Sequence, residues 1–223
     1  MALLPCVAPS VMTPHAPALH LFFHPHSRAA MVRWMLEECG ARYALTRLEF
    51  GADMKSPGYL ALNPMGKVPT LLHGDTVITE TAAIVAYLAE LFPEQQLAPA
   101  PGSALRGSYY RWMFYLAGPA DAALTAQHLG HLADQTPEHA SMAGYGRLED
   151  VVETLRQAVA GRRYLCGDQF TAADLLMVSY LRWGHTMKLL PPLPEFSAYS
   201  LPLLDRPASL RALALNEAEL ATA

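Results

Sequence analysis

The sequence predicts a small α/β domain followed by a larger all-α domain, and three observations support this prediction. Short apolar runs bounded by turn residues, which are typical of strands, occur only before residue 80. Residues 93–103 are rich in Pro, Ala and Gly, which is typical of a linker. After them, every apolar pattern has the period of a helix. We therefore expect an irregular N-terminal extension, an α/β domain, a linker and an all-helical domain at residues 1–17, 18–93, 94–104 and 105–223.

The elements of the first domain are expected in the order β-α-β-α-β-β-α. A His24-Pro25-His26 segment ends the first strand, and Val32, Leu36 and Cys39 then share one face of a helix that Gly40 closes. The last helix ends before Pro93. The expected strands cover residues 18–23, 42–50, 68–72 and 76–79, with a turn-rich region at 51–66 and a tight turn at 74–75. A parallel first pair of strands with an antiparallel hairpin is a thioredoxin-like arrangement.

The second domain is expected to be a bundle of helices. The expected helices cover residues 106–134, 138–161, 171–187 and 208–220, with a bend at Gly118-Pro119 and a loop-rich segment at 191–207. Thr171 and Asp174 have the spacing of a capping box, so we assign both to folding. Replacing Asp174 with Ala is expected to cost about 0.5–2 kcal/mol, the range for a lost cap.

The composition favours a folded protein and argues against a role on nucleic acid. Hydrophobic residues make up 52% of the 223 residues and charged residues 16%, which excludes disorder as the main state. A net charge of −4 and the absence of a basic patch give no electrostatic case for nucleic acid. Cys6, Cys39 and Cys166 lie far apart, so we expect no metal site and no dithiol motif. Unpaired cysteines are typical of a reducing compartment, and we expect a cytoplasmic protein.

Two apolar stretches resemble membrane segments only superficially. No charged residue occurs before residue 24, but the stretch lacks the basic start of a signal peptide and contains Pro5, Pro9, Pro14 and Pro17. The stretch at residues 112–133 contains Asp, Gln and His residues that are too polar for a membrane span. We therefore expect no association with a membrane.

A proline near the start of the third strand is the first candidate for a binding site. Gly66 permits an unusual turn, and Pro69 cannot donate a hydrogen bond to a sheet. If the Val68–Pro69 bond is cis, the backbone of Val68 faces outward and can pair with an extended peptide. The more common alternative is a trans proline at the first residue of an edge strand, because only about 5–6% of X-Pro bonds are cis.

Two helix N-termini are further candidates. Thr81 lies where a helix follows the fourth strand, and such an N-terminus attracts a carboxylate, while Glu80 beside it can bind an ammonium group. Together they would hold both charged groups of an amino acid. Ser27-Arg28 opens the first helix, where a hydroxyl can donate to a bound anion. Simple helix capping is the alternative at both places.

In a thioredoxin-like sheet these three segments meet at one edge, and at this point the sequence resembles the cytosolic glutathione S-transferases of bacterial type. Residues 27–40, 63–71 and 79–88 are similar to that family's first helix and its glutathione-binding motifs, and residues 167–174 resemble its capping-box segment. The match covers roughly residues 18 to 215 in the expected order.

The resemblance implies an enzyme that activates the thiol of glutathione, its co-substrate, and conjugates it to small hydrophobic electrophiles. It places glutathione along Val68 and Pro69, with its γ-glutamyl end on Glu80 and Thr81. Lys67 and Lys55 are candidates for contacts with its carboxylates. Members of the family differ in using Tyr, Ser or Cys near the sulfur. Here the candidates are Ser27, Arg28 and a backbone N–H.

The resemblance also implies an electrophile pocket between the domains and a homodimer. The pocket candidates are His24, His26, Tyr109, Trp112, Tyr115 and Trp183. Glutathione-dependent isomerisation, peroxide reduction and reductive dehalogenation stay open as alternatives, because they share the glutathione site. A non-catalytic interaction module of the same fold also stays open.

Overall fold

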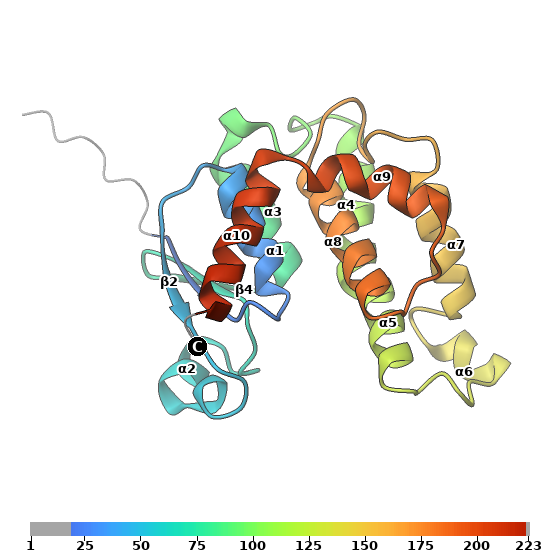
Figure 1. Cartoon of the computed structure of the whole chain (residues 1–223), viewed down its shortest axis with the longest axis horizontal. Coiled ribbons are helices and arrows are strands. Elements are labelled where there is room, and N and C mark those ends of the chain that lie inside the picture. The colour runs from blue at the N-terminus through green and yellow to red at the C-terminus, as the bar shows by residue number, and fades with distance from the viewer. Residues whose placement is uncertain (1–18, 222–223) are drawn as a thin grey trace, which may run out of the picture.

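The computed structural model of the chain describes residues 19–221, and the expected extension at residues 1–17 lies outside the described residues. Figure 1 shows the strands and the first helices on one side of the molecule and the remaining helices on the other. The order of elements through the first domain is the predicted β-α-β-α-β-β-α. The fold is a thioredoxin-like domain followed by a helical domain, as the sequence predicts.

A four-stranded sheet forms the centre of the first domain. Its strands are β1 (Leu19–Phe23), β2 (Tyr43–Arg47), β3 (Thr70–His73) and β4 (Thr76–Thr79). The strand order is β2-β1-β3-β4. β1 is parallel to β2 and antiparallel to β3, and β3 is antiparallel to β4. Alternate residues of β1 are buried, because successive side chains of a strand point to opposite faces of the sheet.

Three α-helices complete this domain: α1 (Ala29–Glu38), α2 (Pro57–Leu62) and α3 (Thr81–Leu91). α2 lies in the turn-rich region, after a short 3₁₀ helix, η1 (Asp53–Lys55). The hydroxyl of Ser56 accepts a hydrogen bond from the N–H of Tyr59, and Pro57 occupies the first helical position, so the local sequence starts α2. α1 and α3 pack against each other and bury the apolar faces that the sequence predicts.

The helical domain begins after a 3₁₀ helix, η2 (Pro93–Gln95), and an irregular segment at residues 96–104. Its helices are α4 (Leu105–Tyr115), the π-helical segment η3 (Leu116–Ala120), α5 (Asp121–His128), α6 (Pro137–Met142), α7 (Leu148–Val159), α8 (Ala172–Thr186), α9 (Pro194–Leu204) and α10 (Pro207–Ala221). Most residues of α8 are buried, and it contacts α4 and α9 in its own domain and α1 and α3 in the first domain. One hydrophobic core therefore extends through both domains.

The structure differs from the sequence predictions at two places in this domain. Residues 191–207 were expected to be loop-rich, but they contain α9. Pro194 is at the start of α9, where a helix tolerates proline, and Phe196, Tyr199, Ser200 and Leu203 form a buried stripe at helical spacing. The expected helix at 138–161 is two helices, α6 and α7, which a segment containing Gly146 at φ +66° separates.

The predicted capping box is present at the start of α8 and belongs to a larger buried network. Asp174 is fully buried and accepts hydrogen bonds from the N–H of Thr171 at 2.7 Å and from its hydroxyl at 2.9 Å. It also accepts from the N–H of Leu165 at 2.7 Å and from the hydroxyl of Tyr199 at 2.5 Å. Burial raises the pKa of Asp174, and these hydrogen bonds oppose the shift.

The last helix returns to the first domain, where it lies against α1 near β2 (Figure 1). Arg33 of α1 is buried and donates to the C=O of Leu215 and the side chain of Asn216. Arg47 of β2 donates to the C=O of Glu219. In the opposite direction, Arg206 makes two 2.7 Å hydrogen bonds to Glu38, and Arg211 pairs with Glu37. We call this set of contacts, made by Arg33, Arg47, Arg206 and Arg211, the C-terminal clasp.

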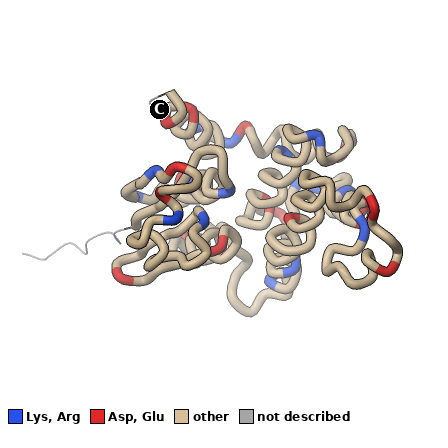
Figure 2. The backbone as a smooth tube through the Cα atoms, turned by 90° about the horizontal axis from the view of Figure 1, so that it is seen from below, with Lys and Arg blue, Asp and Glu red and all other residues tan. Residues whose placement is uncertain are grey.

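Charged side chains are few, and the two signs are interspersed over both domains (Figure 2). Among the helices between residues 19 and 221, none is both long enough and apolar enough to cross a membrane.

Candidate functional site

The strand register brings three junctions to one edge of the sheet. Phe22 of β1 is paired with Thr70 of β3, and Thr70 is paired with Thr79 of β4. The chain beyond this row is the β1–α1 loop on β1, the segment before β3, and the start of α3 after β4. Neighbouring strands lie about 4.8 Å apart, so β1 and β4 frame a site about 10 Å wide.

The segment before β3 presents unpaired backbone groups at this edge. The Val68–Pro69 peptide bond is cis, the rarer of the two isomers that the sequence allows. The C=O of Lys67 accepts hydrogen bonds from the Tyr59 hydroxyl at 2.6 Å and the Asn63 side chain at 2.8 Å, which hold the segment in place. Within residues 19–221, neither the N–H nor the C=O of Val68 has a hydrogen-bond partner. A donor and an acceptor of one residue are thus available to an extended peptide.

The turn before that segment requires a glycine. Gly66 has φ +57°, and a Cβ atom there would lie 2.5 Å from the C=O oxygen of Met54. Lys55, a sequence candidate, donates from Nζ to the C=O of Met65 at 2.9 Å. Lys67, the other lysine candidate, is exposed and precedes Val68. Both ammonium groups therefore lie beside the cis-proline segment.

The start of α3 combines a strained residue with unpaired donors. Glu80, the N-cap residue, has φ 69° and ψ 120°, a conformation that side chains rarely adopt. Its own side chain is exposed and makes no capping hydrogen bond. Neither the N–H nor the hydroxyl of Thr81 has a partner in the described part of the chain. Strain of this kind costs about 1–3 kcal/mol and is concentrated at functional sites.

The β1–α1 loop presents a main-chain donor and keeps its side chains engaged. The Ser27 hydroxyl donates to the C=O of His24 at 2.7 Å and accepts from the N–H of Ala29 at 3.1 Å, so its proton is already used. The Arg28 guanidinium donates to Asp121 of α5 at 2.7 Å. In contrast, no hydrogen bond between described residues uses the N–H of Arg28. The free donor at the N-terminus of α1 is therefore this N–H.

The Arg28 side chain instead connects the two domains. It also reaches the hydroxyl of Thr125 at 3.3 Å and lies over the ring of Trp183, 5.0 Å from its centroid. Asp121 and Thr125 were not candidates from the sequence, because a contact over more than ninety positions leaves no local pattern. Trp183 is the pocket candidate that the structure places next to α1.

The other pocket candidates are not gathered around one cavity. His26 is exposed in the β1–α1 loop, but His24 is 5% exposed and covered by Phe50. Tyr109 and Trp112 are 1% and 4% exposed and belong to the core. Tyr115 is close enough to Thr154 and Asp150 of α7 for both to influence its pKa, so it faces away from α1. Tyr109 and Trp112 are buried by packing, because apolar rings at helical spacing form the core between helices.

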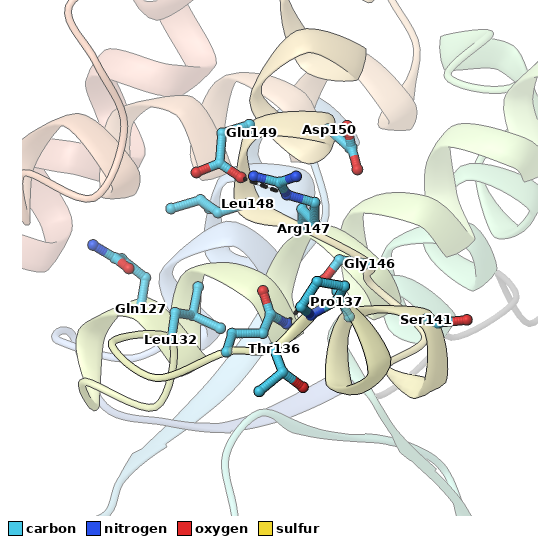
Figure 3. A pocket seen from close by; sticks show the side chains of 12 residues that line it. Gln127, Leu132, Thr136, Pro137, Ser141, Gly146, Arg147, Leu148, Glu149 and Asp150 are labelled. Carbon is cyan, nitrogen blue, oxygen red and sulfur yellow. Dashed lines mark hydrogen bonds and ion pairs between the residues drawn. The ribbon is translucent and has the colours of Figure 1, made fainter.

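A cavity of about 590 Å³ lies at the far end of the helical domain, between α5, α6 and α7 (Figure 3). Gln127, Thr136 and Arg147 are among the residues that line it, and Arg147 pairs with Glu149 there. None of the sequence candidates lines this cavity. We find no group of three potential metal-ligating side chains among residues 19–221.

The buried cysteines are not suited to be nucleophiles. Burial raises the pKa of Cys39 to about 12 and that of Cys166 to about 11. At pH 8 the thiolate then makes up about one part in ten thousand of Cys39 and one part in a thousand of Cys166. A thiol reaction at this protein must therefore use a sulfur that does not come from these two residues.

This gives a direct expectation for chemical labelling. In a Cys6→Ser variant at pH 8, we expect iodoacetamide to leave the folded protein unmodified. Two equivalents should react after denaturant is added, as counted by mass spectrometry. Modification of the folded variant at the rate of a free cysteine would contradict the expectation.

The family models that match this chain are those of the glutathione S-transferase N-terminal domain, over residues 17–90, and the glutathione S-transferase C-terminal domain, over residues 110–207. The chain is 31% identical over 201 residues to glutathione S-transferase GstA of Escherichia coli O157:H7, covering 85% of this chain and 94% of GstA. It is 32% identical over 174 residues to glutathione S-transferase GST-4.5 of Xanthomonas campestris, covering 74% of this chain and 84% of that protein.

Solved structures show the same likeness. The theta class glutathione S-transferase of Xanthomonas axonopodis pv. citri, solved with glutathione bound, has a TM-score of 0.71 and 30% identity, covering 88% of this chain and 97% of that one. The glutathione transferase URE2P5 of Phanerochaete chrysosporium has a TM-score of 0.76 at 22% identity, covering 93% and 98% of the two chains, and shows the shared fold.

Proposed function

Because the chain belongs to the glutathione S-transferase family, we propose that it binds glutathione along Val68 and transfers the glutathione sulfur to small hydrophobic electrophiles. The observation that carries this proposal is the group of unpaired donors and acceptors at one edge of the sheet: Val68, Thr81 and the N–H of Arg28. These groups would have no common purpose in a module that only associates with proteins.

Each part of glutathione finds a partner of matching chemistry at this edge. The Glu80 carboxylate binds the ammonium group of the γ-glutamyl residue, and the N–H and hydroxyl of Thr81 bind its carboxylate. The N–H and C=O of Val68 pair with the central cysteinyl residue as in a sheet. Lys67 and Lys55 lie where they can reach the glycine carboxylate. An extended tripeptide is about 10 Å long, which matches the distance from β1 to β4.

The sulfur is activated by the N-terminus of α1. A thiol of pKa about 8.5 is only a few per cent ionised at pH 7, and lowering its pKa by two units takes about 2.7 kcal/mol. A hydrogen bond to a charged acceptor contributes about 1.5–3 kcal/mol, and the helix field adds about 0.3–1 kcal/mol. The N–H of Arg28 therefore suffices as the donor. Ser27 shapes the loop, and its hydroxyl reaches the sulfur only by leaving the C=O of His24.

The electrophile lies on the other side of the sulfur, against Trp183 and the Arg28–Asp121 pair. Because Asp121 neutralises the guanidinium, this surface favours an uncharged, aromatic or apolar substrate over an anion. On the outer face of α4, Tyr110 and Phe114 form an exposed aromatic pair, with Phe114 72% exposed, which fits the expected homodimer.

Replacing Glu80 with Gly tests the binding mode. Glycine adopts φ 69° without strain, so the variant should be as stable as the wild type or more stable, by up to about 1 kcal/mol. At the same time, loss of the carboxylate should raise the dissociation constant of glutathione at least about tenfold, as measured by calorimetric titration. A Glu80→Gln variant, which keeps the side-chain size, separates charge from shape.

The matched control is Glu90→Gln in α3, since this carboxylate pairs with Arg106 away from the site. It should bind glutathione as the wild type does. If Glu80→Gly binds glutathione as tightly as the wild type, the γ-glutamyl assignment is wrong. If the wild type neither binds glutathione nor conjugates it to an aryl halide, the proposed function itself is wrong.

A further inference from the structure

His24 has a geometry that neither the fold nor the electrophile pocket explains. Its imidazole is 5% exposed and its centroid lies 4.1 Å from that of Phe50. Nδ1 accepts a hydrogen bond from the N–H of His26 at 3.2 Å. Because Nδ1 is the acceptor, the ring proton is on Nε2, which faces the Glu49 carboxylate at 3.4 Å. The buried ring is therefore held as one neutral tautomer.

The backbone of the same residue holds the catalytic loop. The C=O of His24 accepts from the N–H of Ser27 at 3.0 Å and from its hydroxyl at 2.7 Å. Both the side chain and the main chain of His24 thus fix the turn that ends in the free N–H of Arg28. A shift of this turn would move that N–H relative to the sulfur, and a misplacement of about 1 Å can cost about a hundredfold in rate.

We propose that His24 is a positioning residue whose neutral imidazole locks the β1–α1 loop, so that protonation of Nδ1 releases the loop and switches catalysis off. This inference rests on the proposed function, because it assigns a pH sensor to that same site. A protonated ring carries N–H groups on both nitrogens, so it can no longer accept from His26. The consequence is an acid limit on activity that comes from the enzyme in addition to the one from the thiol.

The charges around the ring determine where this switch acts. Burial lowers the pKa of His24, and Arg47 and His26 act in the same direction, whereas the Glu49 carboxylate raises it. The folded state therefore binds the proton less readily than the unfolded state. Stability and loop order should both be complete above pH 6.5 and should decrease as the pH falls below it.

The test compares two substitutions of His24. Asn has a side-chain oxygen that can accept from the N–H two residues ahead, as in an Asx turn, but it does not titrate. We expect the H24N variant to retain kcat/KM for glutathione within about threefold of wild type at pH 8. H24L has no acceptor and should lose at least about tenfold at the same pH.

The pH profile provides the decisive measurement. The thiol titrates in both enzymes, so the ratio of kcat/KM in H24N to that in wild type removes its contribution. This ratio should be constant at high pH and should rise about tenfold for each pH unit below the pKa of His24. A constant ratio between pH 5 and 8, or an H24L variant as active as wild type, would overturn the proposal. Thermal unfolding at each pH shows whether the loss of activity precedes unfolding.

A second readout does not depend on catalysis. The His26 amide resonance in a ¹⁵N-labelled, glutathione-free protein should shift with pH in wild type and stay constant in H24N. If the amide titrates but no form of the enzyme conjugates glutathione, the proposed function fails and the link to His24 stands. If the enzyme conjugates glutathione but the amide does not titrate, the positioning role of His24 fails alone.

Discussion

An Arg28→Pro variant is expected to lose about 10²–10³-fold in kcat/KM for glutathione conjugation. Proline has no N–H, so the substitution deletes the proposed donor to the thiolate, and loss of one such donor typically has an effect of this size. The backbone can accept the change, because Arg28 has φ −61° and proline fixes φ near −65°. No internal hydrogen bond is lost, since the N–H is unpaired within residues 19–221.

Arg28→Ala is the matched control for this experiment. Both variants lose the guanidinium and its contacts with Asp121 and Trp183, but only the proline variant loses the main-chain donor. Ultraviolet absorbance of the bound thiolate, followed against pH, should show a lowered thiol pKa in wild type and Arg28→Ala and an ordinary one in Arg28→Pro. Equal thiol pKa values in the two variants would show that the activating group is another, with the Ser27 hydroxyl tested next by Ser27→Ala.

Asp174→Ala is expected to have the largest effect on stability, a loss of about 3–5 kcal/mol. A lost cap alone costs about 0.5–2 kcal/mol. However, removing this carboxylate also leaves the N–H of Leu165 and the hydroxyl of Tyr199 buried without an acceptor. For a chain of this size, the melting temperature should fall by about 6–20 °C, as measured by calorimetry.

Asp168→Ala is the control, because Asp168 is exposed six positions earlier in the same segment. It should change the stability by no more than about 0.5 kcal/mol. A similar small change in Asp174→Ala would show that the buried network contributes little and that the cap is replaced by water.

The sequence was sufficient for the fold because its local signals agree with the tertiary structure. The strands from β1 to β4 and helices α1, α3 and α8 lie close to the predicted positions, since turn residues and apolar periodicity specify them independently. The segment containing α9 was misjudged because its prolines suggest a loop, whereas the buried stripe from Phe196 to Leu203 is what decides its conformation.

The site was predictable only as a location. The sequence brought the three segments to one edge, but both isomers of the Val68–Pro69 bond were compatible with it. The use of the Ser27 proton within its own loop and the pairing of Arg28 with Asp121 depend on loop geometry and on distant contacts. Buried Tyr109 and Trp112 show why aromatic residues on a helix are weak indicators of a pocket.

The C-terminal clasp has a consequence for how the protein is made. Arg33 is 4% exposed, and the groups that accept its hydrogen bonds, such as the C=O of Leu215, are among the last residues of the chain. While the ribosome still holds these residues, the nascent first domain has a cationic side chain and part of α1 open to water. The two halves therefore mature as one unit at the end of translation, which ties completion of the glutathione site to release of an intact chain.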